Sequence, residues 1–243
     1  TFTQPEGAVK IAATFKETEE KKAADKAEAE KKAKEEAEAE KQAYVKRIIA
    51  MNEGASTIQK SDYIKTVWNK VDEADYYVVY ITRCGDTYKN GDSYVIKDTD
   101  VTDYTIRKFN GKNLDLKNNY KVVVAAYKKT DKGRVRIART LVSHITGTTN
   151  ATYTNPSELK LEKKSVSLKT GKTYKIKGKV TLADSKKTML SDKHAATLRY
   201  LSSDTKVATV TKSGKIKAVG KGKCYVYVYT NNGFNKKVKV TVK

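Results

Sequence analysis

Hydrophobic positions follow two different periods along this 243-residue chain, and the change falls near residue 55. Residues 16–53 consist mostly of Ala, Glu, Lys and Gln, which are strong helix formers, and Gly54 then offers a stop. Alanine is the only apolar residue type between positions 23 and 43, so a leucine-based coiled-coil seam is absent. The pattern predicts a long charged helix, which acts as a solvated spacer or packs through its alanines on a partner helix.

The residues before the helical segment and the last turns of the segment differ from its middle. Residues 1–15 alternate apolar and polar side chains, as a leader or a short strand would. The last turns carry the larger apolar side chains that the rest of the helix lacks, and we expect this end to dock on the following domain. These side chains are Tyr44, Val45, Ile48, Ile49 and Met51.

From residue 57 the apolar positions alternate, and turn signals recur about every ten residues, as in an all-β sandwich. A polar connector at 148–156 divides this region into two domains, 57–147 and 157–243. The strands predicted for the first domain are 63–69, 76–83, 93–97, 103–107, 119–128 and 135–145. Those predicted for the second are 165–168, 173–182, 197–201, 206–211, 215–219, 223–230 and 236–242.

The first of these domains resembles the fibronectin type III family. Trp68 stands in an early strand, where that family places its core Trp, and a Val-rich strand follows Tyr120. Leu114 and Tyr120 match the family's Leu…Tyr corner, although Leu116 replaces the usual Pro. The resemblance implies that Trp68, Leu114 and Tyr120 are core residues and that the Tyr120 hydroxyl bonds to nearby backbone.

The second domain is similar to the bacterial immunoglobulin-like group 2 family. The motif S-S-D-x-x-V-A-x-V, from Ser202 to Val210, is followed by G-x-I from Gly214. The resemblance implies that Val207 and Val210 are core residues. Tyr200 stands where many members carry Trp, and residues 183–196 form an enlarged connection.

Together these features predict a mainly β fold, with two immunoglobulin-like β-sandwich domains in tandem preceded by a long charged α-helix. Members of both families occur mostly in tandem on secreted and surface proteins, so the resemblances imply an extracellular setting on a bacterial cell surface. A trimmed or mature chain would lack the secretory signal that is missing here, and no apolar run is long enough to cross a membrane. Scarce cysteine is also common in the surface proteins of Gram-positive bacteria.

The net charge of +22 raises nucleic acid as a partner, but its distribution argues against one. Residues 155–243 hold 22 Lys and Arg against 5 Asp and Glu, and Arg199 is the only arginine among them. Surfaces that read nucleic acid usually rely on the bidentate fork of Arg. Lysine spread along strands indicates a generally cationic surface.

No arrangement of residues in the sequence indicates an enzyme or a cofactor. His144 and His194 are far apart in the sequence, and neither has a spacing to other residues that suggests a catalytic partner. Two histidines are also too few for most metal sites. Cys84 and Cys224 fall in different domains, so we expect two reduced, buried thiols. Three nearby acidic residues leave a calcium site open: Asp98, Asp100 and Asp103. This group lacks the Gly turn and the terminal Glu of the helix–loop–helix calcium motif.

Three tyrosines alternate with apolar residues in one predicted strand, and lysines alternate with valines in the next. If the valines line the core, the tyrosines form an outward stripe beside lysines, where aromatic rings could stack on the sugars of anionic glycans or cell-wall polymers. The alternative is that they form cross-strand pairs, with Lys stems lying over the rings. The candidate ligand-binding residues are Tyr225, Tyr227, Tyr229, Lys237 and Lys239.

The sequence therefore predicts a non-catalytic extracellular segment of a bacterial surface protein that acts as a spacer or adhesion module. The alternative is a carbohydrate-binding accessory module that uses the Tyr/Lys strand face. The expected partners of the chain are host or cell-wall glycans or surface proteins, and the oligomeric state stays open.

Overall fold

The computed structural model describes residues 19–191 and 195–243. The predicted leader at 1–15, the first residues of the predicted helix and His194 lie outside the described residues. The chain divides into two compact units, Thr1–Lys41 and Gln42–Lys243. Helix α1, Glu19–Asn52, crosses the division between them.

Helix α1 changes character along its length. In the first unit its residues 20–41 are exposed, as expected for a surface of Glu, Lys and Ala. In the second unit Ile48, Ile49 and Met51 are buried, and Met51 is part of the core of the sandwich that follows. The helix ends at Asn52, and Gly54 adopts φ 78°, a left-handed conformation that glycine takes without steric cost.

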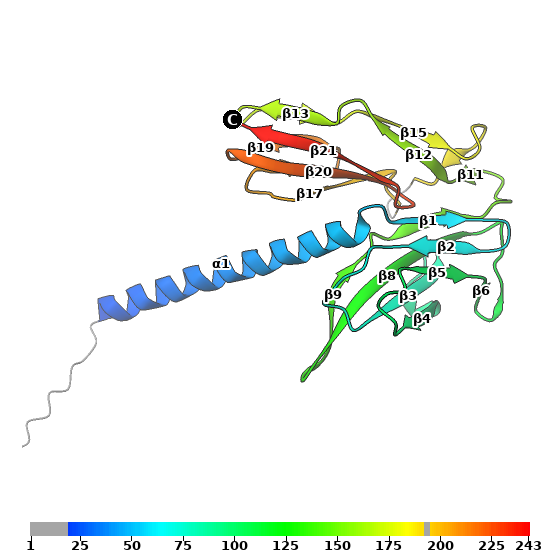
Figure 1. Cartoon of the computed structure of the whole chain (residues 1–243), viewed down its shortest axis with the longest axis horizontal. Coiled ribbons are helices and arrows are strands. Elements are labelled where there is room, and N and C mark those ends of the chain that lie inside the picture. The colour runs from blue at the N-terminus through cyan, green and yellow to red at the C-terminus, as the bar shows by residue number, and fades with distance from the viewer. Residues whose placement is uncertain (1–18, 192–194) are drawn as a thin grey trace, which may run out of the picture. The chain divides into compact units, whose positions relative to one another are not determined.

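The middle sandwich, Ser56–Thr146, consists of two antiparallel sheets (Figure 1). One has the order β1-β2-β5, and the other has the order β10-β8-β3-β4 with β9 also paired to β8. The first sheet contains β1 (Ser56–Gln59), β2 (Ile64–Val67) and β5 (Asp103–Ile106). The second contains β3 (Tyr76–Arg83), β4 (Asp92–Ile96), β8 (Asn119–Thr130), β9 (Gly133–Arg139) and β10 (Ser143–Thr146). The sandwich also includes a short hairpin, formed by β6 (Lys108–Phe109) and β7 (Lys112–Asn113), and the 3₁₀ turn η1 (Tyr88–Asn90).

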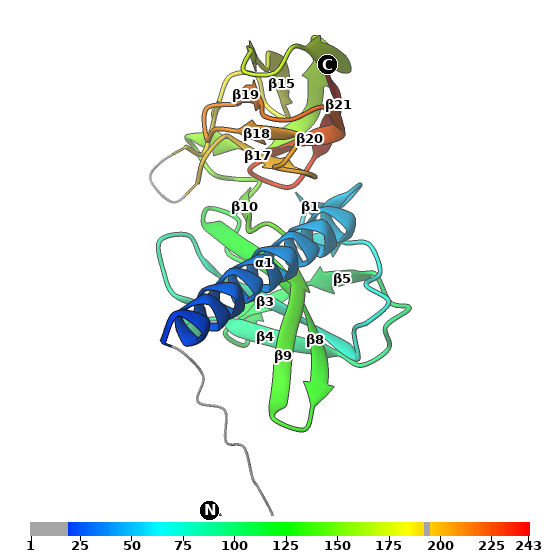
Figure 2. The same cartoon turned by 90° about the vertical axis from the view of Figure 1, so that its left-hand side faces the viewer.

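The strand predicted at 135–145 is interrupted in the structure. It forms β9 and β10, which both pair with β8 and are separated by residues 140–142 (Figure 2). Thr140 causes the interruption, because its side-chain hydroxyl, in place of a backbone carbonyl, accepts the hydrogen bond from the Val124 N–H at 2.9 Å. The edge strand therefore pairs with β8 in two ladders whose registers differ by one residue, as at a β-bulge.

The core of the middle sandwich is aromatic. Trp68 and Tyr77 are buried, with ring centroids 5.4 Å apart in an edge-to-face arrangement, and Leu114 is buried in the same core. Tyr120 is buried too, and its hydroxyl accepts a hydrogen bond from the Asp115 N–H at 3.0 Å and donates one to the Asp115 carbonyl at 3.3 Å. This corner ties the turn before β8 to the core.

The C-terminal sandwich has its own apolar core, so the two sandwiches are separate folding cores. Its main sheets have the orders β13-β21-β20-β17 and β14-β19-β18, and two-stranded ladders join β12 to β15 and β11 to β16. The strands of the main sheets are β13 (Ser165–Leu168), β14 (Thr173–Lys175), β17 (Leu198–Ser202), β18 (Ala208–Val210), β19 (Lys215–Ala218), β20 (Gly222–Thr230) and β21 (Asn235–Val242). The ladders use β11 (Tyr153–Thr154), β12 (Pro156–Leu161), β15 (Gly178–Leu182) and β16 (Thr188–Met189).

Strand β20 forms the centre of this core. Cys224, Val226 and Val228 are buried in it, and β20 pairs with β21 over the residues from Gly222 to Tyr229 (Figure 1). Val207 is buried and Val210 is half-buried against the same core. The strand predicted at 173–182 is broken into β14, which pairs with β19, and β15, which pairs with β12, so the chain changes its pairing partner between Lys175 and Gly178.

Candidate functional site

The three tyrosines of β20 do lie on the face opposite the valines, with lysines of β21 as cross-strand neighbours. Tyr225 is paired with Lys239, and Tyr227 is paired with Lys237. The Lys237 Nζ lies 4.9 Å from the centroid of the Tyr225 ring and 5.7 Å from that of Tyr227. This is the cross-strand arrangement with Lys over the rings.

The expectation of an outward stripe is wrong for two of the three tyrosines. Tyr225 is 38% exposed, but Tyr227 is 6% exposed and Tyr229 is fully buried. Alternation identifies the face on which a side chain lies, but it does not reveal what covers that face. Here the cover comes from parts of the chain that are far away in sequence.

A third apolar cluster, which we call the tyrosine cluster, forms over this face. The rings of Tyr227 and Tyr229 stack with centroids 6.2 Å apart, and Ile49 of the helix end is buried against them. The cluster is completed by Val45, Leu141 and Leu201, which are half-buried. It therefore joins the end of α1, the edge strand of the middle sandwich and the C-terminal sandwich.

Polar contacts at the end of α1 surround the tyrosine cluster. The Glu53 carboxylate accepts hydrogen bonds from the Lys237 ammonium at 2.5 Å and from the Tyr227 hydroxyl at 3.3 Å. The bond to Glu53 raises the pKa of Lys237, and burial raises the pKa of Tyr227. Asn235 donates to the Asn52 carbonyl at 2.8 Å. The helix end is thus held by side chains of β20 and β21.

Arg199 links the two sandwiches directly. Its guanidinium donates to the Val142 carbonyl at 2.6 Å and to the Thr230 carbonyl at 2.6 Å. Burial, and after it the charge of Arg139, lowers the pKa of Arg199 to about 10. A buried arginine with two carbonyl partners fixes the orientation of the strands that supply them.

The turn after β20 adds backbone contacts between the sandwiches. The Thr57 N–H donates to the Asn232 carbonyl at 2.9 Å, and the His144 N–H donates to the Asn231 carbonyl at 2.8 Å. The Asn232 side chain donates to the Pro156 carbonyl at 3.0 Å. Sequence reasoning missed this turn, although two consecutive asparagines before Gly233 are a recognisable turn signal.

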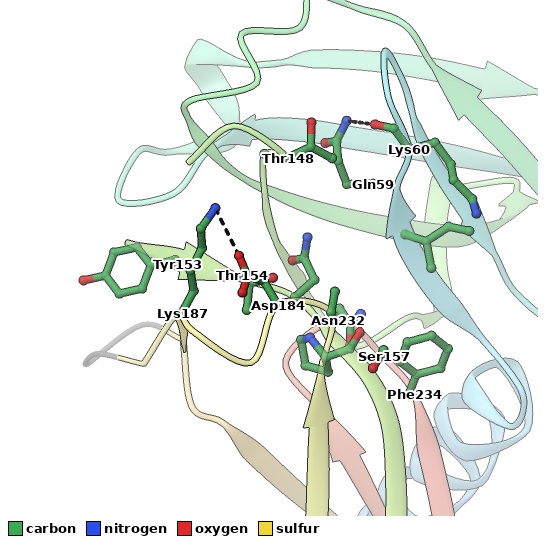
Figure 3. A pocket seen from close by; sticks show the side chains of 15 residues that line it. Gln59, Lys60, Thr148, Tyr153, Thr154, Ser157, Asp184, Lys187, Asn232 and Phe234 are labelled. Atoms are coloured by element: carbon green, nitrogen blue, oxygen red, sulfur yellow. Dashed lines mark hydrogen bonds and ion pairs between the residues drawn. The ribbon is translucent and has the colours of Figure 1, made fainter. Parts of the chain in front are cut away.

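A pocket of about 480 Å³ lies beside this turn (Figure 3). The connector at 148–156, the end of β1 and the β15–β16 loop line it with hydroxyls, amides and a Lys187–Asp184 ion pair at 3.6 Å. Gln59 donates to the Lys60 carbonyl at 2.8 Å on the opposite wall. The described residues that line the pocket include no His or Cys.

The three aspartates at which the sequence left calcium open are each held by a lysine or a backbone N–H. Asp100 is paired with Lys70 at 2.5 Å and Asp103 with Lys65 at 3.1 Å, and Asp98 accepts the Asp100 N–H. Within residues 19–191 and 195–243, no three His, Cys, Asp or Glu side chains converge as metal ligands.

The two cysteines form no disulfide in the described part of the chain. Cys224 is buried, but Cys84 is half-buried rather than buried, because it lies just beyond the end of β3. Its Sγ lies 3.4 Å from Nδ1 of His144, which is buried on β10. No helix in the part of the chain that the structure describes has the length and apolar composition required to span a membrane.

These features define a mainly β protein with a long N-terminal helix and immunoglobulin-like sandwich domains. Residues 158–242 match the model of the bacterial Ig-like domain (group 2) family, which confirms the resemblance of the C-terminal sandwich. The match fits a non-catalytic module of a surface protein. It does not include the middle sandwich, whose resemblance to fibronectin type III domains stays a prediction.

A comparison with curated protein sequences gave no match. Among solved structures, the chain is similar to the S-layer protein rSbsC, with a TM-score of 0.29 and 16% identity over 74% of this chain and 22% of that one. It is also similar to domains 4 and 5 of the S-layer protein SbsC, with a TM-score of 0.30 and 13% identity over 73% and 82% of the two chains. For the FN1–FN3 domains of chicken CNTN1 the TM-score is 0.30, with 11% identity over 78% and 65%.

Proposed function

We propose that this chain is a non-catalytic segment of a bacterial cell-surface protein that acts as a rigid extracellular spacer. The observation that carries the proposal is the burial of Tyr227 and Tyr229 in the tyrosine cluster. Tandem domains move relative to one another by default, unless a large apolar interface joins them. Here a helix end and two sandwiches share one apolar cluster, which favours a stiff joint.

The polar contacts support the same function. Carbonyl groups of both sandwiches are satisfied by Arg199, and the Glu53–Lys237 pair holds the helix end. Each contact fixes a direction as well as a distance, so together they resist hinge motion. A surface protein would use such a joint to hold its outer domains at a set distance, for adhesion or for assembly with surface proteins or glycans.

Equilibrium unfolding in urea tests the joint. Trp68 is the only tryptophan in the chain, so its fluorescence reports on the middle sandwich, whereas the far-ultraviolet circular dichroism reports on both sandwiches. The wild-type chain should unfold with coincident transitions, because the sandwiches stabilise each other. Tyr229→Ala should separate the transitions and cost about 3–5 kcal/mol, the range for truncation of a buried aromatic side chain.

Tyr225→Ala is the matched control, because it removes a tyrosine from the same strand and face but outside the buried part of the cluster. It should leave the transitions coincident. Separate transitions in the wild-type chain, or an equal effect of the two variants, would show that the cluster does not couple the sandwiches.

Carbohydrate binding at the Tyr/Lys face is a second candidate function. Tyr225, Lys237 and Lys239 still present an exposed ring with two cationic neighbours. The site is smaller than the sequence predicts, since the rings of Tyr227 and Tyr229 are covered. A triple tyrosine variant would also damage the joint, so Tyr225→Ala/Lys239→Gln is the informative variant, and it forms one arm of the titration described below.

A further inference from the structure

We propose that a pocket on the outer face of the middle sandwich binds an acidic sugar residue of a polysaccharide. The pocket has a volume of about 400 Å³ and lies over strands β3, β8 and β9. Such a volume is in the lower part of the range of small-molecule sites, about 300–1,000 Å³. Its polar and aromatic lining comes from Tyr80, Tyr88, Tyr127, Arg136 and Arg139.

The aromatic wall of this pocket is fixed by contacts among the tyrosines. The hydroxyls of Tyr80 and Tyr127 are 3.1 Å apart and hydrogen-bonded, and Tyr76 stacks on Tyr127 with ring centroids 5.4 Å apart. Tyr88 meets Tyr80 edge to face at 6.0 Å. Burial, and after it the hydrogen bond with Tyr127, raises the pKa of Tyr80 to about 12, so this hydroxyl stays protonated as a hydrogen-bond donor or acceptor. A site held in this way is ordered before any ligand arrives.

The other wall is cationic and lacks an acidic counterpart. Three of the seven arginines of the chain lie on β9, and the described residues that line the pocket include Arg136 and Arg139 but no Asp or Glu. The charge of Arg139 also acts on the buried guanidinium of Arg199. An anion in the pocket would offset this repulsion between the positive charges of Arg139 and Arg199.

The combination of groups selects the chemistry of the ligand. Arginine matches a carboxylate or a phosphate with its planar fork, whereas lysine acts as a point charge. Fixed tyrosine side chains offer apolar ring surface for the C–H groups of a sugar ring and hydroxyls for its oxygens. An acidic sugar presents both features in one residue. This site is distinct from the Tyr225 face of the C-terminal sandwich, and it adds recognition to the spacer function.

Isothermal titration calorimetry of the full chain with oligogalacturonate tests the proposal. We expect binding at about 150 mM salt, where long-range attraction between exposed charges is screened. Arg136→Gln/Arg139→Gln should weaken it by about tenfold or more, because it removes two charge-assisted hydrogen-bond donors. Arg136 is exposed, so Arg136→Gln alone gives a weaker but measurable loss if the double variant does not fold.

The matched control is Lys129→Gln/Lys132→Gln, which removes the same charge from the same hairpin but outside the pocket, and it should bind like the wild type. Neutral galactan oligosaccharide and poly-glutamate should bind at least about tenfold more weakly than oligogalacturonate, since each lacks one of the two features that the pocket recognises. Absence of oligogalacturonate binding, equal binding of either comparison ligand, or equal losses in the two double variants would overturn the proposal. A loss confined to Tyr225→Ala/Lys239→Gln would also overturn it and place the glycan site on the C-terminal sandwich.

Discussion

Tyr120 and Tyr229 show how differently one residue type is used in this chain. Both rings are buried. The hydroxyl of Tyr120 exchanges hydrogen bonds with the backbone of Asp115, whereas the hydroxyl of Tyr229 is buried without a partner among the described residues. Burial raises the pKa of both groups, so both stay protonated at neutral pH. Tyr120 therefore stabilises a turn through its hydroxyl, and Tyr229 contributes through its ring.

The role of the Tyr120 hydroxyl is testable by Tyr120→Phe, which keeps the ring and removes both hydrogen bonds. We expect the free energy of unfolding of the middle sandwich to fall by about 1–3 kcal/mol, because the Asp115 N–H then lacks its partner. Urea denaturation followed by Trp68 fluorescence measures the change. Tyr63→Phe is the control, since that ring is half-buried in the same sandwich, and it should change stability by less than about 0.5 kcal/mol. Equal effects of the two variants would contradict the account.

At the scale of elements, alternation in the sequence located some strands to the residue. The prediction of 76–83 coincides with β3, and that of 165–168 coincides with β13. Strands β1, β11, β12 and β16 were not predicted, and the two-residue β11 and β16 are too short to show any periodicity. Breaks such as the one at Thr140 depend on side-chain bonds to a neighbouring strand, which the sequence does not reveal.

The same limit explains the outcome for the candidate site. The sequence placed Tyr225, Tyr227 and Tyr229 on one face of β20, and the structure agrees. Their exposure could not be predicted, because it depends on Ile49 and Leu141, which precede β20 by about 170 and 80 positions. A hint existed in the apolar end of the helix, whose docking surface had to lie on one of the sandwiches.

The turn between β18 and β19 gives a prediction at this scale. Gly214 has φ 80°, and a Cβ there would lie 2.6 Å from the Tyr200 ring. Gly171 has nearly the same φ, 81°, but a Cβ there would meet no atom within 4 Å. We expect Gly171→Ala to cost about 1–2 kcal/mol for the left-handed backbone. Gly214→Ala should cost about 1–3 kcal/mol more, because the ring must move.

Thermal and urea unfolding of the C-terminal sandwich, followed by circular dichroism, measures this difference. Since both variants share the backbone strain, the difference isolates the contact between the turn and Tyr200. Equal losses in Gly214→Ala and Gly171→Ala would mean that the ring moves freely and that this contact does not position the turn.

At the scale of the molecule, the central claim is that residues 42–243 behave as one body. The tyrosine cluster, Arg199 and the Asn231–Asn232 turn all connect the sandwiches, and each uses residues from distant parts of the chain. Loss of any one contact leaves the others, so the joint should tolerate conservative changes at its edge. Removal of the central ring of Tyr229 should weaken all of them together.

Residual dipolar couplings of backbone amides in weakly aligned solution test this claim most directly. The account predicts that one alignment tensor fits both sandwiches of the wild-type chain, and that Tyr229→Ala requires two tensors of different magnitude. Two tensors of different magnitude in the wild-type chain would contradict the account, because they would mean that the sandwiches reorient independently despite the buried cluster.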